Sequence, residues 1–245
     1  MTETIPLFPL GTVLFPGVVL PLHIFEPRYR TLVRDLMDQP SEAEHEFGVV
    51  AIRQGAETGE HDHTSLYTIG CSARLKQVKT YPDGRFDIVT VGHRRFRLTG
   101  TDHTSAPYLR GEVDWLPDPL GTAGLADRLA PSVLAAFRRY LRMLAEASGT
   151  AESATGDPTT PGAVPLAGSD AGSEQLPEDP AVLAHLVAAS TALTVPDRQR
   201  LLAAPDTATR LRAEMIMLRR ETGLLHTLRA VPAPLSEFRV PTSTN

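Results

Sequence analysis

The sequence predicts an α+β protein in which a β-barrel is followed by α-helices. In the first ~115 residues, short apolar runs are separated by turn residues, a pattern typical of strands. After Pro119 the apolar residues recur every three or four positions, which indicates helices. Many strands with few helices favour a closed or nearly closed sheet for the amino-terminal part.

Changes in composition divide the chain further. We expect the barrel at residues 1–118 and a helical subdomain at residues 119–148 and 180–230. Residues 149–179 contain no aromatic, lysine or arginine side chain. Such a segment cannot bury enough surface to offset the entropy of ordering, so we expect a disordered loop there and a tail at residues 231–245.

The first strands are interrupted by proline. Residues 5–8 and 18–22 are apolar runs, separated by the turn signal Pro16-Gly17. Proline cannot donate a ladder hydrogen bond, so Pro6 and Pro21 predict edge strands or bulges.

A short helix is expected at residues 26–37, with Pro27 in its first turn. One face of this helix is apolar and consists of Tyr29, Leu32, Val33 and Leu36. Residues 47–52 then form a compact apolar strand.

A hairpin is the clearest local feature of the barrel. Its strands lie at residues 66–78 and 85–91, joined by a turn at residues 81–84. Residues 95–98 alternate strictly in polarity, so we expect both arginines of this stretch to face water. Residues 108–115 supply one more strand.

The helical part begins with apolar spacing at residues 125–144, where Pro131 predicts a kink or a break. Asp179, Thr194 and Asp206 are suited to cap the later helices. The last helix carries an apolar seam of about two heptads. It suits intramolecular packing better than a coiled-coil dimer, and it consists of Leu211, Met215, Leu218, Thr222 and Leu225.

Charge and hydropathy limit the class of protein. The net charge is -5, which argues against a broad nucleic-acid surface. Glu3 and several prolines make the apolar start unsuited to a signal peptide. No stretch approaches the ~18 apolar residues of a membrane span, so we expect a cytoplasmic protein with no membrane contact.

The motifs of common enzymes are missing. Lys76 and Lys79 are the only lysines, and neither follows a glycine, so a phosphate-binding Gly-Lys-Ser/Thr loop is excluded. Ser72 lies ~13 Å from Lys76 along a strand, too far for a Ser-Lys dyad. No G-x-S-x-G motif occurs. We therefore expect no catalytic residues and no cofactor.

His61 and His63, with Glu57 and Glu60 nearby, are weak metal candidates. They lie in a polar stretch, and a hydrated connection between strands is the favoured interpretation, so no metal site is predicted. Cys71 is expected to be a small buried apolar group.

A basic cluster covers residues 93–97. It suits either contact with an anion or nucleic acid beside Phe96, or the polar face of an alternating strand, and the second interpretation is favoured.

The opening motifs resemble the Lon N-terminal (substrate-binding) domain family, above all its stand-alone bacterial members. The resemblance rests on residues 5–10, 13–17 and 21–30, with further similarity at residues 92–98 and 196–202. It implies a PUA-like β-barrel with a helical subdomain. It also implies a non-catalytic module that recognises unfolded or partner polypeptides, as an adaptor in protein quality control beside a separate protease. We expect neither the ATPase nor the peptidase domain of full-length Lon here. The alternative is a PUA-like small-molecule or nucleic-acid binder.

Peptide contact is predicted at Phe25, Glu26, Arg28 and Tyr29, because aromatic and arginine side chains supply contact energy at interfaces. A purely structural role is the other interpretation, in which Tyr29 belongs to the core and Phe25 plugs the barrel.

Overall fold

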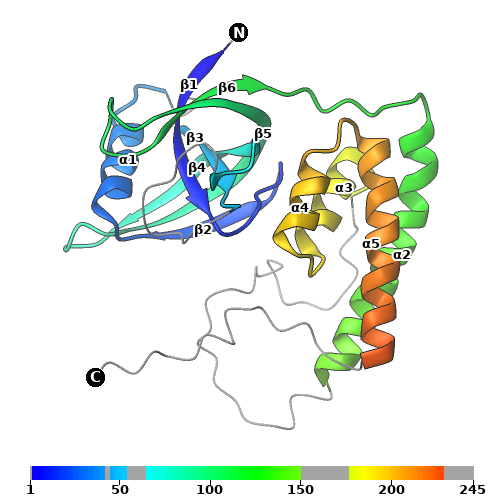
Figure 1. The fold of residues 1–245 in the computed structure, drawn as a ribbon. Helices are drawn as coiled ribbons and strands as arrows, with labels where there is room; N and C mark the ends of the chain where they lie inside the picture. Colours follow the sequence, from blue (N-terminus) through cyan, green and yellow to red (C-terminus); the bar gives the residue numbers. More distant parts are fainter. Residues whose placement is uncertain (1, 42–44, 54–64, 150–176, 229–245) are drawn as a thin grey trace.

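The strands form a sheet that closes on itself. The computed structural model describes residues 2–41, 45–53, 65–149 and 177–228. The strands are β1 (Glu3–Leu10), β2 (Val19–Ile24), β3 (Glu46–Ala51), β4 (Ile69–Thr80), β5 (Phe86–Asp102) and β6 (Arg110–Trp115). They pair in the order β2-β5-β4-β3-β1-β6, and β6 also pairs with β5 (Figure 1). Five strands therefore form a ring, which we call the barrel, and β2 extends it beside β5. The predicted α+β class is confirmed.

The sequence predicted an edge strand or a bulge at Pro6. β1 lies instead between β3 and β6 in the strand order, although the half that carries Pro6 pairs with β6 alone among the described residues. Its first half, residues 3–6, pairs with β6, and its second half, residues 7–10, pairs in parallel with β3. The Leu7 amide donates to the Leu109 carbonyl at 2.8 Å. Successive residues of a strand alternate in direction, so the nitrogen of Pro6 faces away from β6. The proline costs no hydrogen bond in that ladder. β2, which pairs only with β5 among the described residues, is the edge strand.

The predicted short helix, α1 (Pro27–Met37), packs on one side of the barrel (Figure 1). Pro27 stands at its first turn and Glu26 at the N-cap. The four residues of the predicted apolar face are all buried. They join Phe8 and Phe47 of the barrel in one cluster.

The predicted hairpin joins β4 to β5. Gly84 has φ +80°, which suits glycine in a tight turn, and its amide donates to the Tyr81 carbonyl at 2.9 Å. β5 continues unbroken for 17 residues and includes the basic cluster.

The described residues after the barrel form four helices, which we call the helical subdomain: α2 (Leu125–Gly149), α3 (Pro180–Ser190), α4 (Val195–Leu202) and α5 (Thr207–Leu228). Pro131 lies inside an unbroken α2. Asp179, Thr194 and Asp206 each accept a hydrogen bond from an amide in the first turn of the next helix, as predicted. Residues 150–176 and 229–245, which include most of the predicted loop and the whole tail, lie outside the described residues.

The seam of α5 packs inside the chain, which confirms the intramolecular prediction. Leu211, Leu218 and Leu225 are buried against Phe137 and Tyr140 of α2. Cys71 is fully buried as expected, and burial raises the pKa of its thiol.

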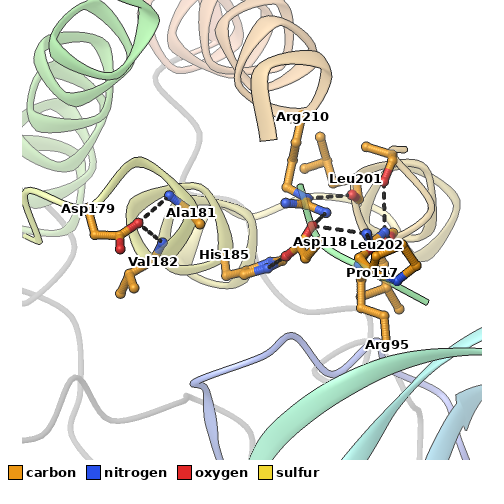
Figure 2. Close-up of polar contacts among 11 residues, drawn as sticks. Arg95, Pro117, Asp118, Asp179, Ala181, Val182, His185, Leu201, Leu202 and Arg210 are labelled. Carbon is orange, nitrogen blue, oxygen red and sulfur yellow. Dashed lines mark hydrogen bonds and ion pairs between the residues drawn. The ribbon is translucent and has the colours of Figure 1, made fainter. Parts of the chain in front are cut away.

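Arg95 of β5 is buried at the junction of barrel and helical subdomain, so the prediction that it faces water is wrong. Its side chain is only 2% exposed, whereas Arg97 is exposed. Its guanidinium donates to the carbonyls of Leu202 and Ala204 at 2.8 and 2.7 Å (Figure 2). The last carbonyls of a helix have no partner within it and carry partial negative charge, so Arg95 caps α4.

Asp118, in the segment that links the two parts, connects this arginine to two helices (Figure 2). Its carboxylate accepts from Arg95 at 2.9 Å and from Arg210 of α5 at 3.0 Å. It also contacts Nε2 of His185, on α3, at 2.6 Å. Arg210 is fully buried and donates to the Leu201 carbonyl at 2.9 Å. We call Arg95, Asp118, His185 and Arg210 the junction network.

Apolar and amide contacts support the junction network. Leu201 and Leu202 of α4 belong to the same buried cluster as the barrel residues. The Gln199 side-chain amide donates to the Ile69 carbonyl of β4 at 2.7 Å. The helical subdomain is therefore docked on the barrel through α4.

Replacing Arg95 should weaken the packing of the helical subdomain on the barrel. Arg95→Met keeps the aliphatic stem but leaves the α4 carbonyls and Asp118 without their buried donor, so we expect a loss of about 3–5 kcal/mol in the free energy of unfolding. Urea denaturation followed by circular dichroism measures it. The matched control is Arg97→Met, two residues along the same strand and exposed, which should change stability by no more than about 0.5 kcal/mol. Equal losses would contradict the assigned role of Arg95.

Stability should also fall with mild acid through His185. Burial lowers the pKa of His185, and the charges of Arg210 and Arg95 act in the same direction, against the opposing effect of Asp118. Its Nδ1 is buried without a hydrogen-bond partner among the described residues, which also favours the neutral ring. An unfolded histidine takes up a proton near pH ~6.5, so the unfolded state gains protons first and stability drops as the pH falls from about 7 to 5.

His185→Gln keeps a donor for Asp118 without titrating. Chemical denaturation between these pH values should give a flatter stability profile for this variant than for the wild type. Parallel profiles would show that His185 does not carry the effect.

Candidate polypeptide-binding groove

The predicted peptide-contact residues surround the start of α1. The Glu26 carboxylate accepts from Arg28, with its oxygen 3.0 Å from Nε and 2.8 Å from the terminal nitrogen. The Arg28 guanidinium lies 4.6 Å from the centre of the Tyr29 ring. The ion pair and the ring contact hold the half-buried Arg28 in one position.

Tyr29 and Phe25 have different environments. The Tyr29 side chain is buried, with its ring stacked on Phe8 at a centroid separation of 3.9 Å. Phe25 is 56% exposed, and its ring centre lies 6.2 Å from that of His23. Tyr29 is therefore a core residue, and Phe25 does not plug the barrel.

A small cavity of about 160 Å³ opens beside Arg28 and Tyr29. The segment between β5 and β6 forms its other wall, with Pro107, Tyr108 and Leu109, and β1 contributes Pro9. Arg28 and Tyr29 are thus brought together in one hollow, whereas Phe25 and Glu26 lie outside it.

A second hollow of about 580 Å³ shares Tyr108 with the first. β1 contributes Glu3 to Pro6, α1 contributes Asp35, Leu36 and Gln39, and the remaining lining residues are Glu46, Arg94, Arg110 and Trp115. We call the two hollows together the β1 groove. It runs along β1 between α1 and β6.

Tyr108 fixes the middle of the β1 groove. Its hydroxyl donates to the Asp35 carboxylate of α1 at 2.8 Å. Burial, with the adjacent Asp35, raises the pKa of Tyr108 to about 12, so the hydroxyl keeps its proton. This bond ties the segment before β6 to α1 at the boundary between the two hollows.

Trp115 and Arg94 form the wide end of the β1 groove. The Arg94 guanidinium lies 3.6 Å from the centre of the Trp115 ring, and the indole nitrogen donates to Glu3 at 2.6 Å. A stacked arginine and a half-buried tryptophan form a rigid amphipathic surface of the kind enriched at protein interfaces. Residues 93–97 therefore serve two purposes, because Arg94 lines the groove while Arg95 caps α4.

Glu46 contributes a fixed negative charge at the same end. It contacts His93 at 3.1 Å and Arg74 at 3.3 Å. Burial by itself would raise the pKa of Glu46, but hydrogen bonds from Ser72 and His93 outweigh it, and the pKa is lowered. The carboxylate is therefore ionised and already paired within the fold.

Tyr108, Arg110 and Trp115 were not predicted as site residues from the sequence. Trp115 is the only tryptophan and ends an alternating strand, which was a usable signal. Tyr108 gave no comparable signal, because its role depends on Asp35, which lies 73 positions away along the chain.

The described residues contain no metal-binding cluster and no membrane-spanning helix. His61 and His63 lie outside the described residues. Within the described ranges, no three His, Cys, Asp or Glu side chains are grouped so as to hold a metal ion. The helices of these ranges include none that is long and apolar enough to cross a membrane.

Comparison with known proteins identifies the family to which this chain is similar. The model of the ATP-dependent protease La (LON) substrate-binding domain matches residues 4–220. "Lon protease 2" of Herpetosiphon aurantiacus is 26% identical over 226 residues, which cover 91% of this chain and 24% of that protein. "Lon protease" of Parabacteroides distasonis is 35% identical over 119 residues, or 47% of this chain and 14% of that protein. The chain thus spans a quarter or less of the length of these relatives.

Solved structures have the same fold. The N-terminal domain of Lon protease from Mycobacterium avium complex aligns with a TM-score of 0.54 and 18% identity, covering 90% of this chain and 98% of that one. A Lon N-terminal domain protein from Xanthomonas campestris aligns with a TM-score of 0.51 and 22% identity, covering 86% and 95%.

The contrast between Tyr29 and Phe25 is testable. Truncating the buried, stacked ring in Tyr29→Ala should cost about 3–5 kcal/mol of unfolding free energy, as for other buried aromatic residues. Phe25→Ala removes a mostly exposed ring and should cost no more than about 0.5 kcal/mol. Urea denaturation of both variants checks this. A larger loss for Phe25→Ala would contradict its exposed position.

Proposed function

We propose that this chain, which belongs to the LON substrate-binding domain family, recognises polypeptide segments in the β1 groove without cleaving them. The family comprises substrate-binding domains of an ATP-dependent protease. We further propose that the chain acts as an adaptor, which presents bound polypeptide to a separate protease in the cytoplasm.

The Arg94–Trp115 surface is the observation that carries this proposal. Trp115 packs one edge on Phe96 inside the barrel, and the rest of the ring remains partly exposed beside an arginine stacked at 3.6 Å. Such a pair binds a wide range of apolar and aromatic side chains, because its contact is a flat surface and not a shaped pocket. Broad recognition of this kind suits a protein that handles unfolded segments.

The shape of the β1 groove favours an extended segment. Consecutive residues of one strand, Glu3 to Pro6, line its wide end, and Tyr108 joins it to the narrow end. An extended chain advances about 3.3 Å per residue and places alternate side chains on opposite sides. Alternate side chains of a bound segment would then reach the Trp115 surface and the hollow at Arg28 and Tyr29.

The residues at the start of α1 complete the proposed site. Arg28 and Tyr29 would form the wall of the narrow end, and Glu26 would hold Arg28 in place through their 2.8 Å contact. Phe25, exposed just before the helix, would offer an apolar contact outside the hollow.

Trp115→Ala tests the proposal. Loss of a central aromatic contact typically costs ~1–2 kcal/mol, so affinity for labelled unfolded peptides should fall about five- to thirtyfold. Fluorescence anisotropy measures this, and thermal denaturation checks the fold. Arg28→Glu should weaken binding at the narrow end. Val182→Ala, a half-exposed residue of α3 outside the β1 groove, is the control and should bind like the wild type.

Two results would reject the function. One is that Trp115→Ala and Arg28→Glu both fold normally and bind peptide with unchanged affinity. The other is salt-dependent binding of RNA that exceeds the binding of any peptide, because that would favour the nucleic-acid alternative.

A further inference from the structure

A second groove lies on the helical subdomain, away from the barrel. It has a volume of about 700 Å³ and runs between α2 and α5, which pack side by side (Figure 1). Its floor is apolar, formed by Met215 and Leu218 of α5. Small residues of α2, Ala135 and Ala136, form one wall. We call it the α2–α5 groove.

Gly223 of α5 lines this groove, at a position where a larger residue would fit. Glycine inside a helix costs stability relative to alanine, because its backbone loses more freedom on folding. A side chain built at Gly223 would meet nothing within 4 Å, and φ there is not positive. Neither close packing nor backbone conformation therefore requires glycine at this position. A glycine that opens a groove to solvent allows another backbone to approach closely.

The charged residues at the sides of the α2–α5 groove are arginines. Arg139 of α2 and Arg219 of α5 line it together with His226, and all three side chains are exposed. None of the described residues that line it is acidic. The whole chain has a net charge of -5, so this local excess of positive charge is opposite to the average surface.

An exposed apolar residue lies beside the groove on the same helix. Ile216 is 69% exposed and lies seven positions before Gly223, so the two share a face of α5. Apolar surface next to small residues is the surface on which a helix packs.

We propose that the α2–α5 groove binds an amphipathic helix of a partner protein, with a small apolar face and acidic residues along its edges. The floor and walls repeat at helical spacing, which suits ridges-into-grooves packing of a third helix. From Met215 to Thr227 the groove has room for about three turns of helix. The acidic edges would face Arg139 on one side and Arg219 on the other. A second copy of this chain is the poorer occupant, because the same cationic faces would repel each other. This site is independent of the polypeptide binding proposed for the barrel.

The probe is a lactam-bridged helical peptide of about twelve residues, with Ala and Leu on one face and Glu along both edges. Its counterparts carry Gln or Lys in place of Glu. Binding to the full chain is measured by fluorescence anisotropy. We expect the Glu peptide to bind about tenfold more tightly than the Gln peptide and the Lys peptide to bind weakest.

Gly223 provides matched variants. Gly223→Trp fills the groove from a position where the fold has space, so it should reduce affinity about tenfold or more while the protein stays folded. Gly223→Ala should raise Tm and leave affinity within about twofold. Arg139→Glu should reverse the preference between the Glu and Lys peptides. Arg128→Glu, an exposed arginine of α2 outside the groove, is the control for general charge effects.

Equal binding of the Glu peptide by wild type and a folded Gly223→Trp variant would overturn the proposal. So would equal loss of affinity in Arg128→Glu and Arg139→Glu, because binding would then follow overall charge. A monomer–dimer equilibrium of the chain alone that Gly223→Trp abolishes, seen by analytical ultracentrifugation, would make a second copy the occupant and would also overturn it.

Discussion

The junction network sets the relation between the two parts of this protein. Two buried arginines, Arg95 and Arg210, need acceptors, and they find them in one carboxylate and in the carbonyls that end α4. Buried charge is tolerated only when it is paired and hydrogen-bonded, so these partners must stay in place. The position of α4, and with it the helical subdomain, is therefore fixed by the chemistry of β5. The apolar contacts of Leu201 and Leu202 bury surface between the barrel and the helical subdomain, whereas the junction network fixes the orientation of α4 on the barrel.

The same strand serves both the junction and the β1 groove. Arg94 faces the groove and stacks on Trp115, and Arg95 faces the helices. The alternation of a strand places these neighbours on opposite sides of one sheet. The proposed recognition surface therefore includes part of β5, a strand whose two faces are both fixed by contacts within the fold. Contact surfaces on rigid elements bind with a smaller loss of conformational entropy than surfaces on loops.

The two grooves differ in the ligand they suit. The β1 groove is lined by carboxylates that already have partners within the fold, beside an aromatic and arginine surface. That mixture suits varied extended segments. The α2–α5 groove has a cationic rim without acidic lining residues among those described, and a glycine that the fold does not require. The two proposals therefore assign separate surfaces of one chain to a bound polypeptide and to a partner.

The sequence alone determined the class of fold, the family and most elements, because apolar periodicity, caps and turn residues act over a few positions. Asp179 caps α3 and Gly84 turns the hairpin as their residue types predict. Tertiary structure decided what depends on distant partners. Pro6 stands in an interior strand because β1 changes partner there, and Arg95 is buried because α4 ends beside it, 107 residues later. Only folding brings Trp115 to Glu3 and Tyr108 to Asp35, since no local pattern records a contact between remote positions.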